Sequence, residues 1–499
     1  MLNMLKLISG ELLKIKTDCL VVPVCEDVEI HDDPAIAALV ESARKIKEFK
    51  GKTDDSLLFY DSSGSGFSRI LFAGLGKHKK SNAESLRRLA GKCVHQAINK
   101  NLSEIVFCAP SPAKLDLTHE SILTAIFEGA FLGNHVFDKY KKEKSENPLK
   151  TISVFTDAEA AKAWRHLPPR VETICKGTLL AREWVSMPSN EKQPDRLVRS
   201  MVKAAEKEDL SFSILDEKSL KQNGMGAILA VGAGSRSKPR LLILDYNPFK
   251  NKKAPKTRKI VVLVGKGVTF DSGGINLKPP ASLDDMKMDM SGAASVAAIL
   301  ITLSRLKHRF RVVGVIPVVE NMPSGEAVRP GDIIKTYSGK TVEIGNTDAE
   351  GRLILADAMS YAVKMFKPDV LIDLATLTGA CVVALGEKIA GVFSTEERLA
   401  KAIVKAGDAV GEICWPMPLF DDYKKLLKSE FADINNMSST RWGGAITAAL
   451  FLSEFVERTP WAHIDIAGPA YSKKADDYCG PGGTGFGVRL LIDFLNKME

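Results

Sequence analysis

The stretch IVVLVGKGVTFDSGG, residues 260–274, decides the fold class. Its first five residues are all apolar and lack the alternation of a half-exposed strand, so they predict a strand covered on both faces. A charged, glycine-containing loop follows at once, with Lys266 and Asp271 in it. Such strands belong to mostly parallel sheets with helices on each side, and ligands bind beyond the carboxyl ends of those strands.

Further runs of the same kind lie on both sides of this stretch, with helical patterns between them. The strand-like runs are LLILDY (241–246), RVVGVIPVV (311–319), DVLIDLA (369–375) and AHIDIA (462–467), and the helical ones include 295–306 and 353–366. Shorter β-rich runs alternate with helical segments near the amino terminus, at 20–24, 56–60, 69–74, 104–109 and 151–156. We therefore predict an α/β protein with two domains: a smaller amino-terminal domain over 1–165, a linker helix over 166–190, and a larger domain with a mostly parallel central sheet over 191–499.

Composition indicates a folded globular chain of 499 residues, with 45% apolar and 26% charged residues. The net charge of +8 allows contact with nucleic acid, but the basic residues are spread among 61 acidic ones and form no obvious stripe, so DNA binding is possible without being indicated. The eight cysteines include no C-x-x-C pair and look like reduced thiols. No secretory signal and no uninterrupted 18-residue apolar run occurs, which predicts a cytoplasmic protein without membrane contact.

Charged residues gather in short loops that follow the predicted strands or precede the predicted helices. These are the acids Asp271, Asp289, Asp348 and Glu350 and the bases Lys266, Lys278 and Arg352. Several carboxylates in one place repel one another unless a cation lies between them, so the group predicts a metal site. Ligation by carboxylates without histidine or thiolate favours Mn²⁺, Mg²⁺ or Zn²⁺, and the H-E-x-x-H pattern of helical zinc proteases is absent.

Each of these residues also has a simpler interpretation when taken alone. Asp348 or Glu350 could merely favour a helix dipole, and Lys266 or Lys278 could be a solvated loop charge. A metal site is favoured because the acids cluster beside glycine-containing turns in otherwise apolar surroundings.

Three of these segments, VGKGVTFDSGG (264–274), MKMDMSG (286–292) and NTDAEGRL (346–353), resemble in order and spacing the signature of the leucine aminopeptidase family, also called the cytosol aminopeptidase family. The resemblance continues through 373–380, 443–452, 463–471 and 482–491, and so covers essentially residues 180–499. The amino-terminal part is similar to the family only in its general βα layout, which in this family is macrodomain-like. One departure lies at 186–190, where SMPSN stands in place of the family's usual asparagine-rich segment.

The resemblance implies a leucyl aminopeptidase with two divalent ions per subunit, Mn²⁺, Zn²⁺ or Mg²⁺, held by Lys266, Asp271, Asp289, Asp348 and Glu350. Of these, Asp271 and Glu350 would bridge the two ions. It implies that Lys278 and Arg352 are the catalytic pair, with a bicarbonate ion at Arg352. The positions matching or adjoining the family's substrate pocket are Met286, Thr376, Leu377, Gly379, Ala467 and Ala470.

By the same resemblance we expect short peptides with a free amino terminus as substrates, a preference for leucine and similar residues, and a role in intracellular peptide turnover. We also expect a homohexamer built as a dimer of trimers. Two alternatives stay open. One is a DNA-binding regulatory protein with secondary or no peptidase activity, and the other is two-metal phosphoester hydrolysis, which uses carboxylates as well.

Overall fold

The computed structural model describes residues 4–61, 66–144, 148–250 and 258–498, and they form two compact units. The smaller unit comprises Met1–Lys176 together with Ala409–Gly411 and Lys474–Pro481. The larger unit comprises Gly177–Asp408, Glu412–Lys473 and Gly482–Glu499. Helix α6 (Leu167–Ser186) runs from the first unit into the second, since the division falls between Lys176 and Gly177.

The smaller unit contains one six-stranded sheet in the order β1-β6-β5-β2-β4-β3. All neighbours in it are parallel except β3, which pairs antiparallel with β4 at one edge. The strands are β1 (Leu5–Ile8), β2 (Cys19–Cys25), β3 (Ser56–Tyr60), β4 (Arg69–Gly76), β5 (Glu104–Cys108) and β6 (Thr151–Phe155). The helices are α1 (Pro34–Arg44), α2 (Ala83–Asn99), α3 (Pro112–Leu115), α4 (His119–Gly133) and α5 (Ala158–Ala163). All five predicted runs are strands here, whereas β1 was not predicted because it has only four residues and includes a lysine.

The larger unit is built on a nine-stranded sheet in the order β16-β15-β18-β14-β9-β11-β8-β7, with β10 also pairing with β11. Parallel pairing joins β18, β14, β9, β11 and β10 in the middle, and antiparallel strands lie toward the edges. The strands are β7 (Ser211–Leu215), β8 (Arg240–Tyr246), β9 (Ile260–Gly265), β10 (Gly267–Asp271), β11 (Arg311–Asn321), β14 (Val370–Ala375), β15 (Ala390–Ser394), β16 (Cys414–Pro416) and β18 (Trp461–Asp465). The predicted α/β class with a mostly parallel central sheet is confirmed.

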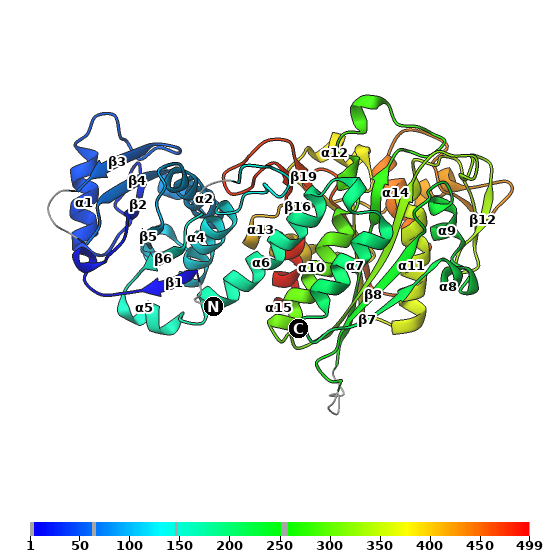
Figure 1. Cartoon of the computed structure of the whole chain (residues 1–499), viewed down its shortest axis with the longest axis horizontal. Coiled ribbons are helices and arrows are strands. Elements are labelled where there is room, and N and C mark those ends of the chain that lie inside the picture. Colours follow the sequence, from blue (N-terminus) through cyan, green and yellow to red (C-terminus); the bar gives the residue numbers. More distant parts are fainter. Residues whose placement is uncertain (1–3, 62–65, 145–147, 251–257, 499) are drawn as a thin grey trace. The chain divides into compact units, whose positions relative to one another are not determined.

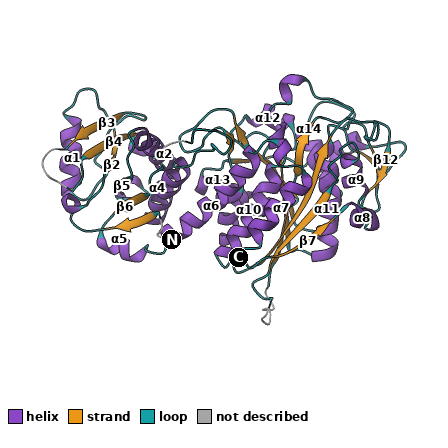
Figure 2. Ribbon diagram, viewed as in Figure 1, coloured by secondary structure: helices purple, strands orange, loops and turns teal. Residues whose placement is uncertain are grey.

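Helices cover both faces of this sheet, which explains why its central strands are apolar without alternation. Helix α10 (Ser291–Arg305) packs with α7 (Pro194–Ala205) and α15 (Val488–Lys497) on one face, and α11 (Glu350–Phe366) packs with α9 (Gly226–Gly232) and α14 (Gly444–Ser453) on the other. Figures 1 and 2 show α7 and α10 on one side of β8 and α9 and α11 on the other. Val262 and Val264 of β9 join the core on the α11 side.

Smaller elements complete the larger unit. They are α8 (Glu217–Gln222), α12 (Gly379–Leu385) and α13 (Glu397–Val410), a three-stranded sheet of β12 (Ile333–Lys335), β13 (Thr341–Glu343) and β17 (Ile434–Asn435), and the pair β19 (Tyr471–Ser472) and β20 (Gly482–Gly483). Within the described residues, one helical stretch, Met286–Arg305, is long and apolar enough to cross a membrane, but 83% of its apolar window is buried inside the protein. That burial is typical of a core helix.

Candidate functional site

The predicted site residues come from strand ends and helix starts of the larger unit. Lys266 lies between β9 and β10, Asp271 ends β10, and Glu350 is the first residue of α11. The backbone at Lys266 is held from two directions, because its N–H donates to the carbonyl of Leu374 (3.0 Å) and its carbonyl accepts from the N–H of Ala293 (2.8 Å). The sheet and the start of α10 therefore determine where the Lys266 side chain begins.

The Lys266 ammonium is buried and has three close acceptors. Its Nζ lies 2.8 Å from Asp289 Oδ1, from Glu350 Oε1 and from the carbonyl oxygen of Thr376. Gly351 leaves room for this side chain, because a Cβ there would lie 2.6 Å from Lys266 Cε. Burial alone would lower the pKa of Lys266, but the carboxylates around it outweigh that effect and raise the pKa. Ligation of a metal through the neutral amine thus requires the charge of a bound cation.

Lys278 joins the two loops that carry Asp271 and Asp348. Its Nζ lies 2.9 Å from Asp271 Oδ2 and forms an ion pair with Asp348 Oδ1. Burial would lower the pKa of Lys278, but the neighbouring carboxylates raise it above its ordinary value. Lys278 is therefore a cation at neutral pH, placed among the acids of the site.

Two buried carboxylate oxygens of the site, Asp289 Oδ2 and Glu350 Oε2, have neither a hydrogen bond nor an ion pair among the described residues, and a third, Asp348 Oδ1, has only its ion pair with Lys278. Asp271, Asp348 and Glu350 also each offer an oxygen within 4.8 Å of the others. Buried acceptors without donors are costly and normally rare, so a divalent cation fits this set of residues. The structure thus brings together all five predicted metal ligands and Lys278.

The electrostatics of the acids agree with that fit. Burial raises the pKa of Asp289 well above its ordinary value, and burial also raises the pKa of Asp271 and of Asp348. Repulsion by the Glu350 carboxylate further raises the pKa of Asp289 and of Asp271, and repulsion by Asp271 further raises the pKa of Asp348. Carboxylates in this condition gain most from a bound cation, which offsets both desolvation and repulsion.

Arg352 lies one position beyond Gly351 on α11 and is also buried. One guanidinium nitrogen, Nη1, donates to the carbonyl of Asn436 (2.8 Å), whereas Nε has no hydrogen-bond partner among the described residues. Burial lowers the pKa of Arg352 to about 10, which still leaves the guanidinium charged at neutral pH. A buried cation with a free N–H is suited to hold an anion.

The six residues predicted to line a substrate pocket differ from one another in their hydrogen bonds and in their exposure. The Thr376 hydroxyl donates to Asp289 Oδ1 (2.6 Å), and the N–H groups of Leu377 and Ala467 both donate to Asp465 Oδ1 (3.1 Å each). Met286 begins a short 3₁₀ turn, Met286–Met288, just before Asp289, and Gly379 is the exposed first residue of α12. Ala470 is buried, with its N–H bonded to the carbonyl of Ile466 (3.0 Å).

Three buried polar residues of the site were not predicted: Asn321, Asn436 and Asp465. Asn436 accepts from the N–H groups of Gly345 and Asn346 through Oδ1 (2.7 and 3.3 Å), and its Nδ2 donates to the carbonyl of Asn346 (2.8 Å). It thereby holds the loop that precedes α11. Asn321 and Asp465 could have been found in the sequence, because each is the last residue of a strand.

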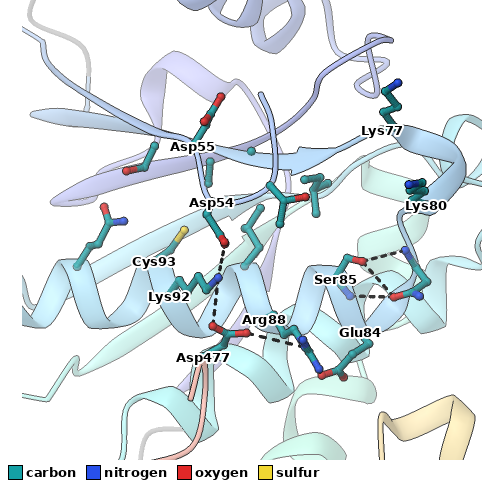
Figure 3. A pocket seen from close by; sticks show the side chains of 18 residues that line it. Asp54, Asp55, Lys77, Lys80, Glu84, Ser85, Arg88, Lys92, Cys93 and Asp477 are labelled. Atoms are coloured by element: carbon teal, nitrogen blue, oxygen red, sulfur yellow. Dashed lines mark hydrogen bonds and ion pairs between the residues drawn. The ribbon is translucent and has the colours of Figure 1, made fainter. Parts of the chain in front are cut away.

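The smaller unit has a cavity of its own, of about 440 Å³, between the end of β4 and one face of α2. Four basic side chains line it, and acids pair with two of them (Figure 3). Lys92 forms ion pairs with Asp54 and with Asp477 (3.1 Å to the latter), and Arg88 lies 2.9 Å from Glu84. Much of the charge in this cavity is therefore balanced inside it.

Comparison with known proteins places these observations in a family. Residues 179–492 match the family described as "Cytosol aminopeptidase family, catalytic domain", and residues 23–144 match its N-terminal domain. A "Probable cytosol aminopeptidase" of Chlorobium phaeobacteroides is 43% identical over 97% of each chain, and one from Cenarchaeum symbiosum is 44% identical over 86% of each. Among solved structures, the "Bottromycin maturation enzyme BotP" is 33% identical with a TM-score of 0.83, over 96% of this chain and 98% of that one. The same enzyme "in complex with Mn" has a TM-score of 0.84.

Proposed function

Because this chain belongs to the cytosol aminopeptidase family, we propose that it is a leucyl aminopeptidase, which removes leucine and similar apolar residues from the free amino ends of short peptides. Family membership confirms the resemblance found in the sequence and identifies the chain as an aminopeptidase. The observation that carries the proposal is the pair of buried oxygens without partners, Asp289 Oδ2 and Glu350 Oε2, beside the Asp271–Asp348–Glu350 cluster.

The proposed cofactor is a pair of divalent ions, Mn²⁺ or Zn²⁺ or else Mg²⁺. Lys266, Asp271, Asp289 and Glu350 would hold one ion, and Asp271, Asp348 and Glu350 would hold the other. When bound, such a pair lowers the pKa of water and polarises the scissile carbonyl. The similar enzyme BotP has a structure "in complex with Mn", which supports Mn²⁺ among these metals.

Lys278 is the residue proposed to meet the charge that develops on the scissile carbonyl oxygen. It is a cation held among the acids of the site, close to where the ions would bind. Arg352 is proposed to hold a bicarbonate ion, which supplies a proton acceptor. The free N–H at Arg352 Nε supports an anion there.

Specificity for the amino end follows if the site recognises the free α-amine, since a blocked terminus offers no such group. The proposed pocket for the first side chain is lined by residues among Met286, Thr376, Leu377, Gly379, Ala467 and Ala470. Apolar pockets discriminate weakly between side chains of similar size, so we expect leucine and methionine to be accepted together. We further propose that the protein forms a homohexamer and acts in peptide turnover in the cytoplasm.

Hydrolysis of leucine p-nitroanilide by chelator-treated protein tests the proposal, with and without Mn²⁺ and beside the N-acetylated substrate. We expect Mn²⁺-dependent cleavage of the free-amine substrate alone, and loss of that cleavage in Glu350→Gln. Glu454→Gln is the matched control, because Glu454 is half-buried and pairs with Lys340 in another part of the larger unit. Absence of cleavage by folded, Mn²⁺-supplied wild type, or equal cleavage of both substrates, would show that the proposal is wrong.

A further inference from the structure

The two oxygens of Asp271 have different partners. Oδ1 accepts from the N–H of Gly273 (2.9 Å) and from Nδ2 of Asn321 (2.8 Å), both of them neutral donors. Oδ2 lies 2.9 Å from Lys278 Nζ, which also pairs with Asp348. Asp271 therefore turns one oxygen toward the framework of the fold and the other toward the remaining acids.

Asn321 is connected to both loops that carry these acids. It is the last residue of β11 and lies opposite Asp271 of β10, after a shift in register between Val268 and Asp271. Its carbonyl accepts from the N–H (3.0 Å) and the hydroxyl (2.7 Å) of Ser272. Its Nδ2 donates a second bond to the carbonyl of Thr347 (3.1 Å), the residue before Asp348.

The orientation of the Asn321 amide is determined by its neighbours. A carboxylate oxygen and a carbonyl can only accept, so the NH₂ group must face Asp271 and Thr347. On its other side, a Cβ added at Gly274 would lie 2.9 Å from Asn321 Oδ1 and 3.0 Å from Thr347 Oγ1. Gly274 also has a φ of +66°, which suits glycine, so the loop backbone packs directly on the amide. The side chain has little freedom to turn.

We infer that Asn321 is a positioning residue for metal binding: its amide occupies Oδ1 of Asp271, directs Oδ2 toward Lys278 and the remaining acids, where a cation would bind, and sets the spacing between Asp271 and Asp348. A neutral donor is suited to this task, because it orients the carboxylate without cancelling the negative charge that a cation needs. The inference rests on the proposed function, since it assumes that Asp271 binds a metal.

Mn²⁺ binding to the full-length, chelator-treated protein tests this role directly, by the electron paramagnetic resonance signal of free Mn²⁺. The variants are Asn321→Leu, which keeps much of the volume, and Asn321→Ala, in case the larger side chain prevents folding. We expect the Kd for Mn²⁺ to rise about 10- to 100-fold in both, as for other residues that orient metal ligands. The Mn²⁺ concentration that half-saturates hydrolysis should rise by the same factor.

Asn134→Leu is the matched control. Asn134 is buried in the smaller unit and also makes two bonds to backbone groups, with Nδ2 donating to the carbonyl of Leu149 (3.0 Å) and Oδ1 accepting from its N–H (2.8 Å). It should lose stability in the metal-free protein and keep the wild-type Kd for Mn²⁺. If folded Asn321 variants bind Mn²⁺ as tightly as wild type, or if the control weakens binding equally, the positioning role is wrong. Failure of the proposed function has a different signature, because the wild type would then neither bind Mn²⁺ nor cleave the substrate.

Discussion

Lys278 in the larger unit and Lys92 in the smaller one each contact two aspartates, yet their surroundings differ. The Lys278 side chain is 16% exposed and its partners Asp271 and Asp348 are 3% and 34% exposed, whereas Lys92 is 38% exposed and its partners Asp54 and Asp477 are 65% and 16% exposed. Water screens the second group, so its charges are satisfied at little cost. In the first group, burial and repulsion raise the pKa of the aspartates. Paired charges alone do not mark a functional site, whereas buried acids that also repel one another are a stronger indication of one.

We expect the largest difference between the two units in kcat, when each lysine is replaced separately by methionine. Lys278→Met should lower kcat about 10²- to 10³-fold, or about 2.7–4 kcal/mol of barrier, because it removes a cation aimed at developing charge. Steady-state hydrolysis of leucine p-nitroanilide at saturating Mn²⁺ measures the effect. Equal losses of kcat in Lys278→Met and Lys92→Met would show that the buried group is no more important for hydrolysis than the exposed one.

Metal binding should stabilise only the larger unit. At a Mn²⁺ concentration about 100-fold above Kd, a ligand specific for the folded state adds about 2.7 kcal/mol to the free energy of unfolding. Hydrogen exchange with and without Mn²⁺ should therefore show protection gained in the loops at 266–274 and 346–352 and none around Lys92. Protection that increases around Lys92 as well would contradict this assignment.

Asp357 offers an intermediate case, because it is buried in the larger unit but its carboxylate has three donors. The N–H groups of Ala227 and Ile228 donate to Oδ2 (2.9 Å each), and the N–H of Tyr337 donates to Oδ1 (2.7 Å). Asp357→Asn should destabilise the fold by about 1–3 kcal/mol, since one buried donor is left unsatisfied. Denaturant unfolding measures the change, and hydrolysis should be retained at a temperature where the variant is folded.

The same residue predicts a pH dependence. Burial raises the pKa of Asp357 to about 7, above its value in the unfolded chain, so the folded protein holds the extra proton. Stability from this group is thus present at low pH and is lost as pH rises through 7, by about 1 kcal/mol between pH 6 and 8. The stability difference between wild type and Asp357→Asn should be smaller at pH 8 than at pH 6. A difference that is constant or grows with pH would contradict the raised pKa.

The smallest expected effect is the change in stability when Lys92 is replaced. Lys92→Met should change the free energy of unfolding by no more than about 1 kcal/mol, because exposed ion pairs contribute little. Denaturant unfolding in low and high salt checks this. A larger loss at low salt would mean that the Asp54–Lys92–Asp477 group is more strongly coupled than its exposure indicates.

The strands that could be predicted from the sequence are those whose apolar residues follow one another without interruption, because such a run indicates burial on both faces. The central strands β9, β11 and β14 follow from their uninterrupted apolar runs, and the acids beyond them follow from the rule on strand ends. Strand β7 could not be found this way, because its SFSIL sequence is largely exposed and includes polar residues. The roles of Asn321 and Asn436 depend on contacts across 50 and 91 positions, respectively, which no local pattern in one sequence reveals.

The segment Lys474–Pro481 belongs to the smaller unit although it follows nearly all of the larger one in the chain. Its backbone packs closely on α2, since a Cβ at Gly91 would lie 2.3 Å from the carbonyl oxygen of Asp477. During synthesis from the amino terminus, α2 emerges from the ribosome long before this segment does. The amino-terminal sheet can thus form early, but the packing of α2 is completed only after the strands of the other unit have been translated.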